Sequence, residues 1–133
     1  LSNFKRLPYF PREQLSQSLA MGDVHLVTMR DGMQGVAVPC KTYGIMAAAR
    51  PVLFVGPPDA DTAQHLRAGN AGFVFATNDT DGLVEKIKEL ANNRDRAAQI
   101  GAGGREYFLQ SHERTPCCEQ WSKLLASFDT CKS

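Results

Sequence analysis

The stretch GVAVPCKTYGIMAAARPVLFVGPP, residues 35–58, shows the structural pattern of this chain most clearly. It opens with a glycine-containing loop, continues from Pro39 as a short helix of small residues, and ends in the purely apolar run 52–55. Proline is favoured in the first turn of a helix. An apolar run without polar alternation is typical of a strand that is buried on both faces. The stretch therefore predicts a loop, a helix and a buried strand in succession, with the small residues 47–49 letting the helix lie close to the strand.

The same alternation of helices and short apolar strands extends in both directions along the chain. The runs 24–29 and 73–75 predict two more buried strands, and residues 3–7 are a weaker fourth candidate. A first helix is expected from Pro11, with Leu15 and Leu19 inward, and a second over residues 61–68. A third follows the capping residues 78–80 and has Leu83, Ile87 and Leu90 inward, and a fourth covers about 95–109 with glycine interruptions. The last helix has an apolar face made of Trp121, Leu124, Leu125 and Phe128. This pattern favours the α/β class: a single three-layer α/β/α Rossmann-like domain, residues 1–133, with a short parallel sheet.

Composition and charge narrow the classes of function. The chain has 133 residues, 43% of them hydrophobic and 22% charged, which is ordinary for a globular domain. A net charge of +1 without a basic cluster argues against a nucleic-acid partner. No apolar segment approaches the ~20 residues that span a bilayer, and no signal peptide is evident, so we expect a cytoplasmic protein. The cysteines lack zinc-ligand spacing and are expected to be free thiols: Cys40, Cys117, Cys118 and Cys131.

Three loops are expected at the carboxyl ends of the strands, where open parallel sheets bind ligands: residues 30–38, 56–60 and 76–79. The first loop is the most informative. Gly32 and Gly35 let the backbone approach a ligand closely, and the helix opening at Pro39 points its N-terminal amides at the same crevice. Lys41 is unfavourable for that helix dipole unless an anion lies nearby. These features favour recognition of a phosphate or diphosphate, although an ordinary loop between a strand and a helix has the same composition.

Other patterns in the sequence are weaker indications of a functional site. The run GAGGRE, residues 101–106, follows no strand and lies inside a helical pattern, so its glycines are expected to permit a bend or a close helix crossing. The three histidines are far apart in the sequence, and His25 is expected to be a hydrogen-bonded histidine of a buried strand. Asp31 and the pair Asp59 and Asp61 lie at the ligand-binding edge without forming an evident metal or paired-carboxylate site. No residue is assigned a catalytic role.

The order PREQLSQSLAMGDVHLVTM (11–29), GVAVPCKTYGIMAAARPVLFVG (35–56) and AGFVFATNDTDGLVEKIKEL (71–90) resembles the C-terminal half of GT-B-fold glycosyltransferases. The likeness is to the bacterial retaining enzymes of the family 4 type that build polysaccharides, in which a VPSK-x-YG-I-x-AAG-x-PV signature recurs. It covers about residues 4–125, and its specific part is the block from 35 to 55.

The resemblance implies a nucleotide-sugar donor held by this domain, and a sugar or lipid-linked acceptor held across a cleft by an N-terminal domain. In that family, backbone amides of the loop before the helix contact the donor. This carries over to Gly32, Met33, Gln34, Gly35 and Val36, with Lys41 helping to bind the diphosphate. Gly44 stands where a ribose-binding glutamate is common, and Tyr43 is a candidate substitute for it. Cys40 and Ala49 stand where serine and glycine are frequent.

The chain starts at Leu1 without an initiator methionine, which is typical of the middle of a longer protein. The resemblance thus implies the donor-binding half of a glycosyltransferase of cell-surface polysaccharide biosynthesis, inactive alone and without cofactor or metal. Residues 111–133 are expected to reach toward the N-terminal domain, and membrane-surface association is expected only of a full-length protein. Two alternatives stay open. One is a non-catalytic α/β binding or signalling module, and the other a divergent, non-catalytic homologue, which the missing carboxylate favours slightly.

Overall fold

The computed structural model describes residues 2–129. Its centre is a sheet of three parallel strands, β1 (His25–Thr28), β2 (Val52–Val55) and β3 (Gly72–Phe75), in the order β1-β2-β3. The helices are η1 (Arg12–Gln14), α1 (Leu15–Ala20), α2 (Lys41–Ala47), α3 (Asp61–Ala68), α4 (Thr80–Asn92), α5 (Arg94–Ser111) and α6 (Arg114–Asp129). The predicted α/β class with a short parallel sheet is confirmed.

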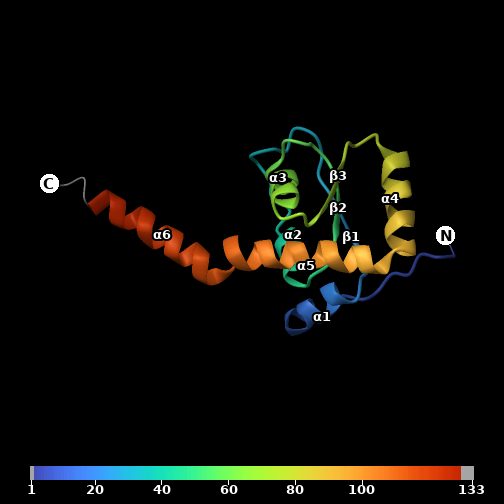
Figure 1. Cartoon of the computed structure of the whole chain (residues 1–133), viewed down its shortest axis with the longest axis horizontal. Coiled ribbons are helices and arrows are strands. Elements are labelled where there is room, and N and C mark those ends of the chain that lie inside the picture. The colour runs from blue at the N-terminus through green and yellow to red at the C-terminus, as the bar shows by residue number, and fades with distance from the viewer. Residues whose placement is uncertain (1, 130–133) are drawn as a thin grey trace.

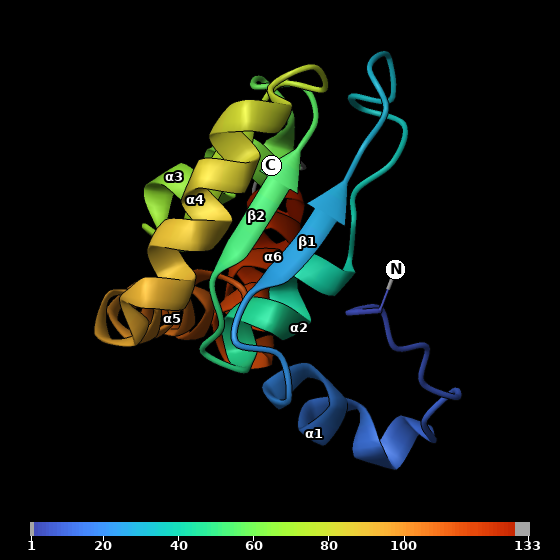
Figure 2. The same cartoon turned by 90° about the vertical axis from the view of Figure 1, so that its right-hand side faces the viewer.

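Helices cover both faces of the sheet (Figures 1 and 2). On one face, α2 and α3 connect the strands and form a core with residues such as Val27 and Phe54. On the other face, Leu53 and Phe75 of the sheet form a second core with Leu90 of α4. In β2 and β3, successive apolar side chains alternate between these two cores, which explains why these strands are apolar without alternation. In β1, Val27 is buried but Leu26 is 52% exposed, so the predicted burial of that strand holds on one face only. The arrangement is the predicted α/β/α layering.

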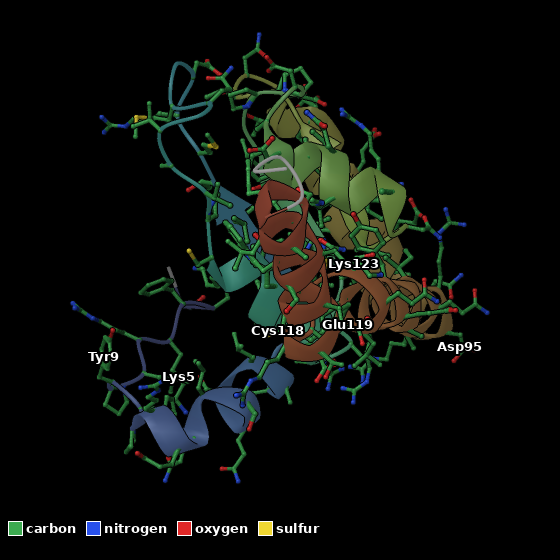
Figure 3. The ribbon with its side chains drawn as sticks, turned by 90° about the vertical axis from the view of Figure 1, so that its left-hand side faces the viewer. Lys5, Tyr9, Asp95, Cys118, Glu119 and Lys123 are labelled. Atoms are coloured by element: carbon green, nitrogen blue, oxygen red, sulfur yellow. The ribbon has the colours of Figure 1, made fainter. Side chains whose placement is uncertain are left out.

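The fourth strand, predicted at residues 3–7, is wrong. Residues 4–10 have no regular secondary structure, and all of them except Phe10 are exposed. Lys5 and Arg6 interrupt the apolar residues, so the segment has no continuous apolar face to bury against the sheet. In Figure 3 the labelled Lys5 and Tyr9 lie on this extended segment, outside the body of the domain.

A hydrogen bond of His25 links helix α1 to strand β1. Leu19 of α1 packs against the first core, whereas Leu15 is 55% exposed, so only half of the predicted inward stripe is buried. His25 of β1 lies with its Nε2 atom 2.7 Å from the carbonyl oxygen of Leu19. The predicted hydrogen-bonded role of His25 is therefore confirmed.

Helix α5 runs without a break through its glycines and crosses the end of the sheet opposite the carboxyl ends of the strands (Figure 1). The predicted interruption is wrong, and the predicted close helix crossing is confirmed. A Cβ atom on Gly101 would lie 2.1 Å from the carbonyl oxygen of Ala49, and one on Gly104 would lie 2.8 Å from the Cβ of Ala71. These glycines are needed for contact with neighbouring backbone, and not for flexibility.

The end of α2 takes part in the same contact. The helix ends at Ala47, and Ala49 has a φ of +54°, a left-handed conformation that costs a residue with a side chain. The small residues at this end contact α5: Arg105 of that helix donates a hydrogen bond to the carbonyl oxygen of Ala47. The predicted helix is thus two residues shorter at this end, because the chain must turn there beneath α5.

Helix α6 extends away from the body of the domain (Figure 1). Its predicted apolar face is exposed: Trp121 by 62%, Leu124 by 48%, Leu125 by 60% and Phe128 by 62%. Figure 3 shows Cys118, Glu119 and Lys123 on this helix, in front of the rest of the molecule. Cys40, Cys117 and Cys118 are free thiols, as predicted. Residues 130–133, with Cys131, lie outside the described part of the chain.

Candidate functional site

The loops that leave the three strands meet at the carboxyl edge of the sheet, at the top of Figures 1 and 2. A hollow of about 410 Å³ opens there. It is lined by residues of all three loops: Asp31, Gly56, Pro58, Ala76, Thr77 and Asn78. The fold therefore creates the crevice that the sequence predicts at this edge.

Loop 30–38 rises highest above the strands (Figure 2). Gly32 and Gly35 have φ angles of +80° and +73°, and a Cβ atom on either would meet nothing within 4 Å. Their backbone thus faces open space, as close approach to a ligand requires. Both positions also need glycine to make the turn.

Some backbone N–H groups of this loop donate hydrogen bonds within the loop, and others have no acceptor among the described residues. Met33 N–H donates to the carbonyl of Arg30 and Val36 N–H to that of Met33, at 3.4 and 3.1 Å. Within residues 2–129, the amides of Gly32, Gln34 and Gly35 have no hydrogen-bond acceptor. The free amides of Gln34 and Gly35 are consecutive, and successive free amides in a turn can form a concave site for anions.

Two side-chain hydrogen bonds tie the loop to its neighbours. Gln34 Nε2 donates to the carboxylate of Asp59, at 3.3 Å, in the loop after β2. Thr77 Oγ1, in the loop after β3, donates to both carboxylate oxygens of Asp31, at 3.4 Å each. Both links are exposed, so water competes with them and each contributes only weakly to holding loop 30–38 against the neighbouring loops. They nevertheless place two carboxylates at the rim of the crevice.

The other predicted site residues belong to α2, which follows this loop in the chain. The chain descends from the loop before α2 begins, and Lys41, its first residue, is exposed (Figure 2). Tyr43 is half-buried against the rings of His65 and His112. Gly44 lies against α1, where a Cβ atom would come within 2.9 Å of Leu19. The structure thus keeps Gly32, Met33, Gln34, Gly35 and Val36 together and turns Tyr43 and Gly44 toward other helices.

Sequence reasoning missed the partners of the two carboxylates. Asp31 and Thr77 are 46 residues apart, and Gln34 and Asp59 are 25 apart. The available signal was topological: each residue follows the carboxyl end of a strand, and those ends meet at one edge.

A larger cavity, of about 570 Å³, lies at the opposite edge of the sheet, between the starts of β1 and β2 and helices α4 and α5. It is lined mainly by apolar residues such as Val24, Pro51 and Leu90. We assign the functional site to the smaller hollow, because parallel sheets bind ligands at the carboxyl ends of their strands. Among residues 2–129, no three His, Cys, Asp or Glu side chains gather as a metal site would require.

No helix in the described part of the chain is both long enough and apolar enough to cross a bilayer.

Comparisons with known proteins agree with this architecture. A family model described as "Glycosyl transferase-like" matches residues 2–121. The protein named "Probable glycosyltransferase WbjE", from Pseudomonas aeruginosa, is 38% identical over 88 residues, which is 64% of this chain and 22% of that protein. The match thus spans about a fifth of that relative's length. No solved structure matches. The chain therefore belongs to the glycosyl transferase-like family, and the expected kinship with the C-terminal domain of GT-B-type bacterial glycosyltransferases is confirmed.

Proposed function

We propose that this chain is the donor-binding domain of a glycosyltransferase that moves a sugar from a nucleotide-sugar to an acceptor in cell-surface polysaccharide biosynthesis. Family membership supports sugar transfer in general terms. The observation that carries the donor-binding role is the raised loop 30–38, with three unused amides above the carboxyl edge of the sheet. In this proposal the acceptor binds to a further domain, toward which α6 extends.

The diphosphate of the donor is recognised mainly by backbone. The amides of Gly32, Gln34 and Gly35 donate to its oxygens, and Lys41 adds a positive charge. Met33 and Val36 shape the loop, because their own amides are used within it. Asp31 and Asp59 would repel phosphate, so we assign them to the hydroxyl groups of the ribose or sugar, which they accept hydrogen bonds from.

Catalysis in this proposal rests on stabilising the departing nucleoside diphosphate. Preorganised amides aimed at developing negative charge act most strongly where water is excluded. The described loops form only one wall of such a site, so we expect no transferase activity from this chain alone. The donor is a substrate and not a cofactor, and the proposed charge stabilisation comes from amides and Lys41, without a metal.

Ligand-observed NMR with the 133-residue chain tests donor binding. Saturation transfer is expected to UDP or GDP, or to a sugar derivative of one of them, and to be weaker for the matching nucleoside because the diphosphate contacts are lost. If none of these nucleotides receives saturation, the donor-binding proposal fails. That outcome would favour a non-catalytic α/β binding or signalling module.

A lysine pair tests the anion contact. Lys41→Ala is expected to weaken nucleoside diphosphate binding several-fold more than nucleoside binding, because only the diphosphate carries the charge that Lys41 would contact. Lys88→Ala is the matched control, since Lys88 is also exposed but lies on α4, away from the loop. Equal losses for nucleotide and nucleoside, or equal effects of the two substitutions, would remove Lys41 from the site.

A further inference from the structure

Four aromatic rings are in mutual contact between α2, α3 and the junction of α5 and α6. Figure 1 shows this junction at the left end of α5. They belong to Tyr43 of α2, His65 of α3, Tyr107 of α5, and His112, which follows the last residue of α5. His112 is central: its ring centroid lies 5.0 Å from that of Tyr43, 4.5 Å from that of His65 and 5.1 Å from that of Tyr107. We call these residues the ring cluster. None of the residues assigned to the donor under the proposed function takes part in it.

The hydrogen bonds of the ring cluster leave one nitrogen without a partner. His65 Nδ1 lies 3.0 Å from the hydroxyl oxygen of Tyr107. His112 Nε2 is buried, and no hydrogen-bond partner reaches it. In the neutral imidazole this nitrogen can be a bare lone pair, which tolerates an apolar neighbourhood. In the protonated ring both nitrogens must donate, so the buried Nε2–H would lack an acceptor and carry charge.

The surroundings decide which protonation state the cluster prefers. Burial, and then the neighbouring His65, lower the pKa of His112. Asp61 of α3 and the thiols Cys40 and Cys117 act electrostatically on Tyr43, whose pKa is raised, chiefly by burial. Cys117 Sγ also lies 3.7 Å from the carbonyl oxygen of Ser111 and so ties α6 to the end of α5.

We propose that the ring cluster is a pH-sensitive clamp: it holds the α5–α6 junction against α2 and α3 while His112 is neutral, and it loosens when His112 is protonated. The junction joins α5 to α6, whose apolar face lies in solvent. The clamp does not depend on what the loop 30–38 binds. It links the position of α6 to the acidity of the medium.

The direction of the pH dependence follows from linkage. We call the clamp closed when the α5–α6 junction packs against α2 and α3, and open when it does not. If the pKa of His112 in the closed state lies below the ordinary histidine value of about 6.5, His112 binds fewer protons in the closed state than in the open state. The clamp is therefore fully closed above about pH 7 and loosens as the pH falls below about 6.5. One proton changes the opening equilibrium by at most about tenfold for each pH unit.

Hydrogen exchange of the 133-residue chain measures this opening. The amides of His112 and Glu113, which both donate to the carbonyl of Phe108, report on the junction, and that of Cys117 on the first turn of α6. After correction for intrinsic exchange rates, their opening constants should rise several-fold to about tenfold per pH unit between pH 6.5 and 5. The amide of Gly56, which bonds to Phe75 within the sheet, is the internal control.

His112→Phe keeps an aromatic ring and removes the titration, so its junction amides should lose this pH dependence. The proposal is overturned if wild-type junction amides follow Gly56, or if His112→Phe keeps the wild-type pH dependence. If the variant does not fold, the histidine ring resonances of the wild type decide. His112 must then titrate below a histidine in an unfolded peptide, and its titration must coincide with shifts of the junction amides; a separate titration refutes the clamp.

Discussion

Gly101 offers the sharpest test of how this domain is held together. A Cβ atom there would lie 2.1 Å from the carbonyl oxygen of Ala49, whereas real Cβ atoms essentially never come within 3.0 Å of such a neighbour. The obstacle is backbone, so no side chain can rotate to make room. In a Gly101→Ala variant, α5 must withdraw by about 1 Å from the turn between α2 and β2.

The magnitude follows from two opposing effects. Overpacking of a core contact costs about 1–3 kcal/mol, and the rigidity of both partners places Gly101→Ala at the upper end. Alanine recovers about 1 kcal/mol relative to glycine within a helix. The net loss is about 2 kcal/mol in the free energy of unfolding, which corresponds to a fall in Tm of roughly 8 °C for a chain of this size.

Thermal unfolding followed by circular dichroism measures this loss, and the same helix supplies the control. A Cβ atom on Gly103 would lie 3.3 Å from the nearest atom, the carbonyl oxygen of Gly69. There the helical gain of about 1 kcal/mol roughly offsets a mild contact, so Gly103→Ala should melt within a few degrees of wild type. If Gly101→Ala melts at or above the temperature of Gly103→Ala, the close crossing of α5 and the α2–β2 turn is refuted.

Substitutions at three further positions test other parts of the fold. Ala49→Gly should stabilise the chain by about 0.5–1 kcal/mol in urea unfolding, because it removes the left-handed strain at φ +54° at a smaller entropic cost; an unchanged midpoint would contradict that conformation. Asp79→Ala should cost about 1 kcal/mol, since the Asp79 carboxylate caps α4 by accepting from Gly82 N–H at 3.1 Å, and Asp79→Asn should recover most of it. Lys86 binds Glu89 and, as the largest cause, lowers the pKa of that carboxyl. This contributes stability above the ordinary glutamate pKa, near 4.3, which is lost as the pH falls through the lower folded value. Lys86→Met should therefore flatten the stability profile between about pH 5 and 3, and an acid limb identical to wild type would show that the pair contributes nothing.

The fold was predictable because its central strands are continuous apolar runs that can be recognised in the sequence. The run 52–55 coincides with β2, and the runs 24–29 and 73–75 contain or overlap β1 and β3. Two-sided burial leaves no polar alternation, and that pattern is visible in a single sequence. The prediction failed for α5, where glycines suggested interruption. They mark positions at which the backbone of another segment lies against the helix, and the sequence does not state that partner.

The site was predictable only in part, for a related reason. Gly32 and Gly35 could be placed at the carboxyl edge because loop positions follow from strand order. Whether a loop amide is free depends on bonds such as that of Val36 N–H to Met33, which local sequence does not determine. The ring cluster was unpredictable because Tyr43, His65 and His112 are brought together by packing of separate helices.

If the junction at His112 loosens, α6 can rotate about that residue as a rigid arm. Its 16 residues give an arm of roughly 24 Å at 1.5 Å per residue. A rotation of about 10° at His112 would therefore carry the far end, with Phe128, through roughly 4 Å, while groups at the distance of the neighbouring rings would shift by about 1 Å. Small adjustments among four side chains are thus amplified into a displacement comparable to a side-chain diameter at the tip.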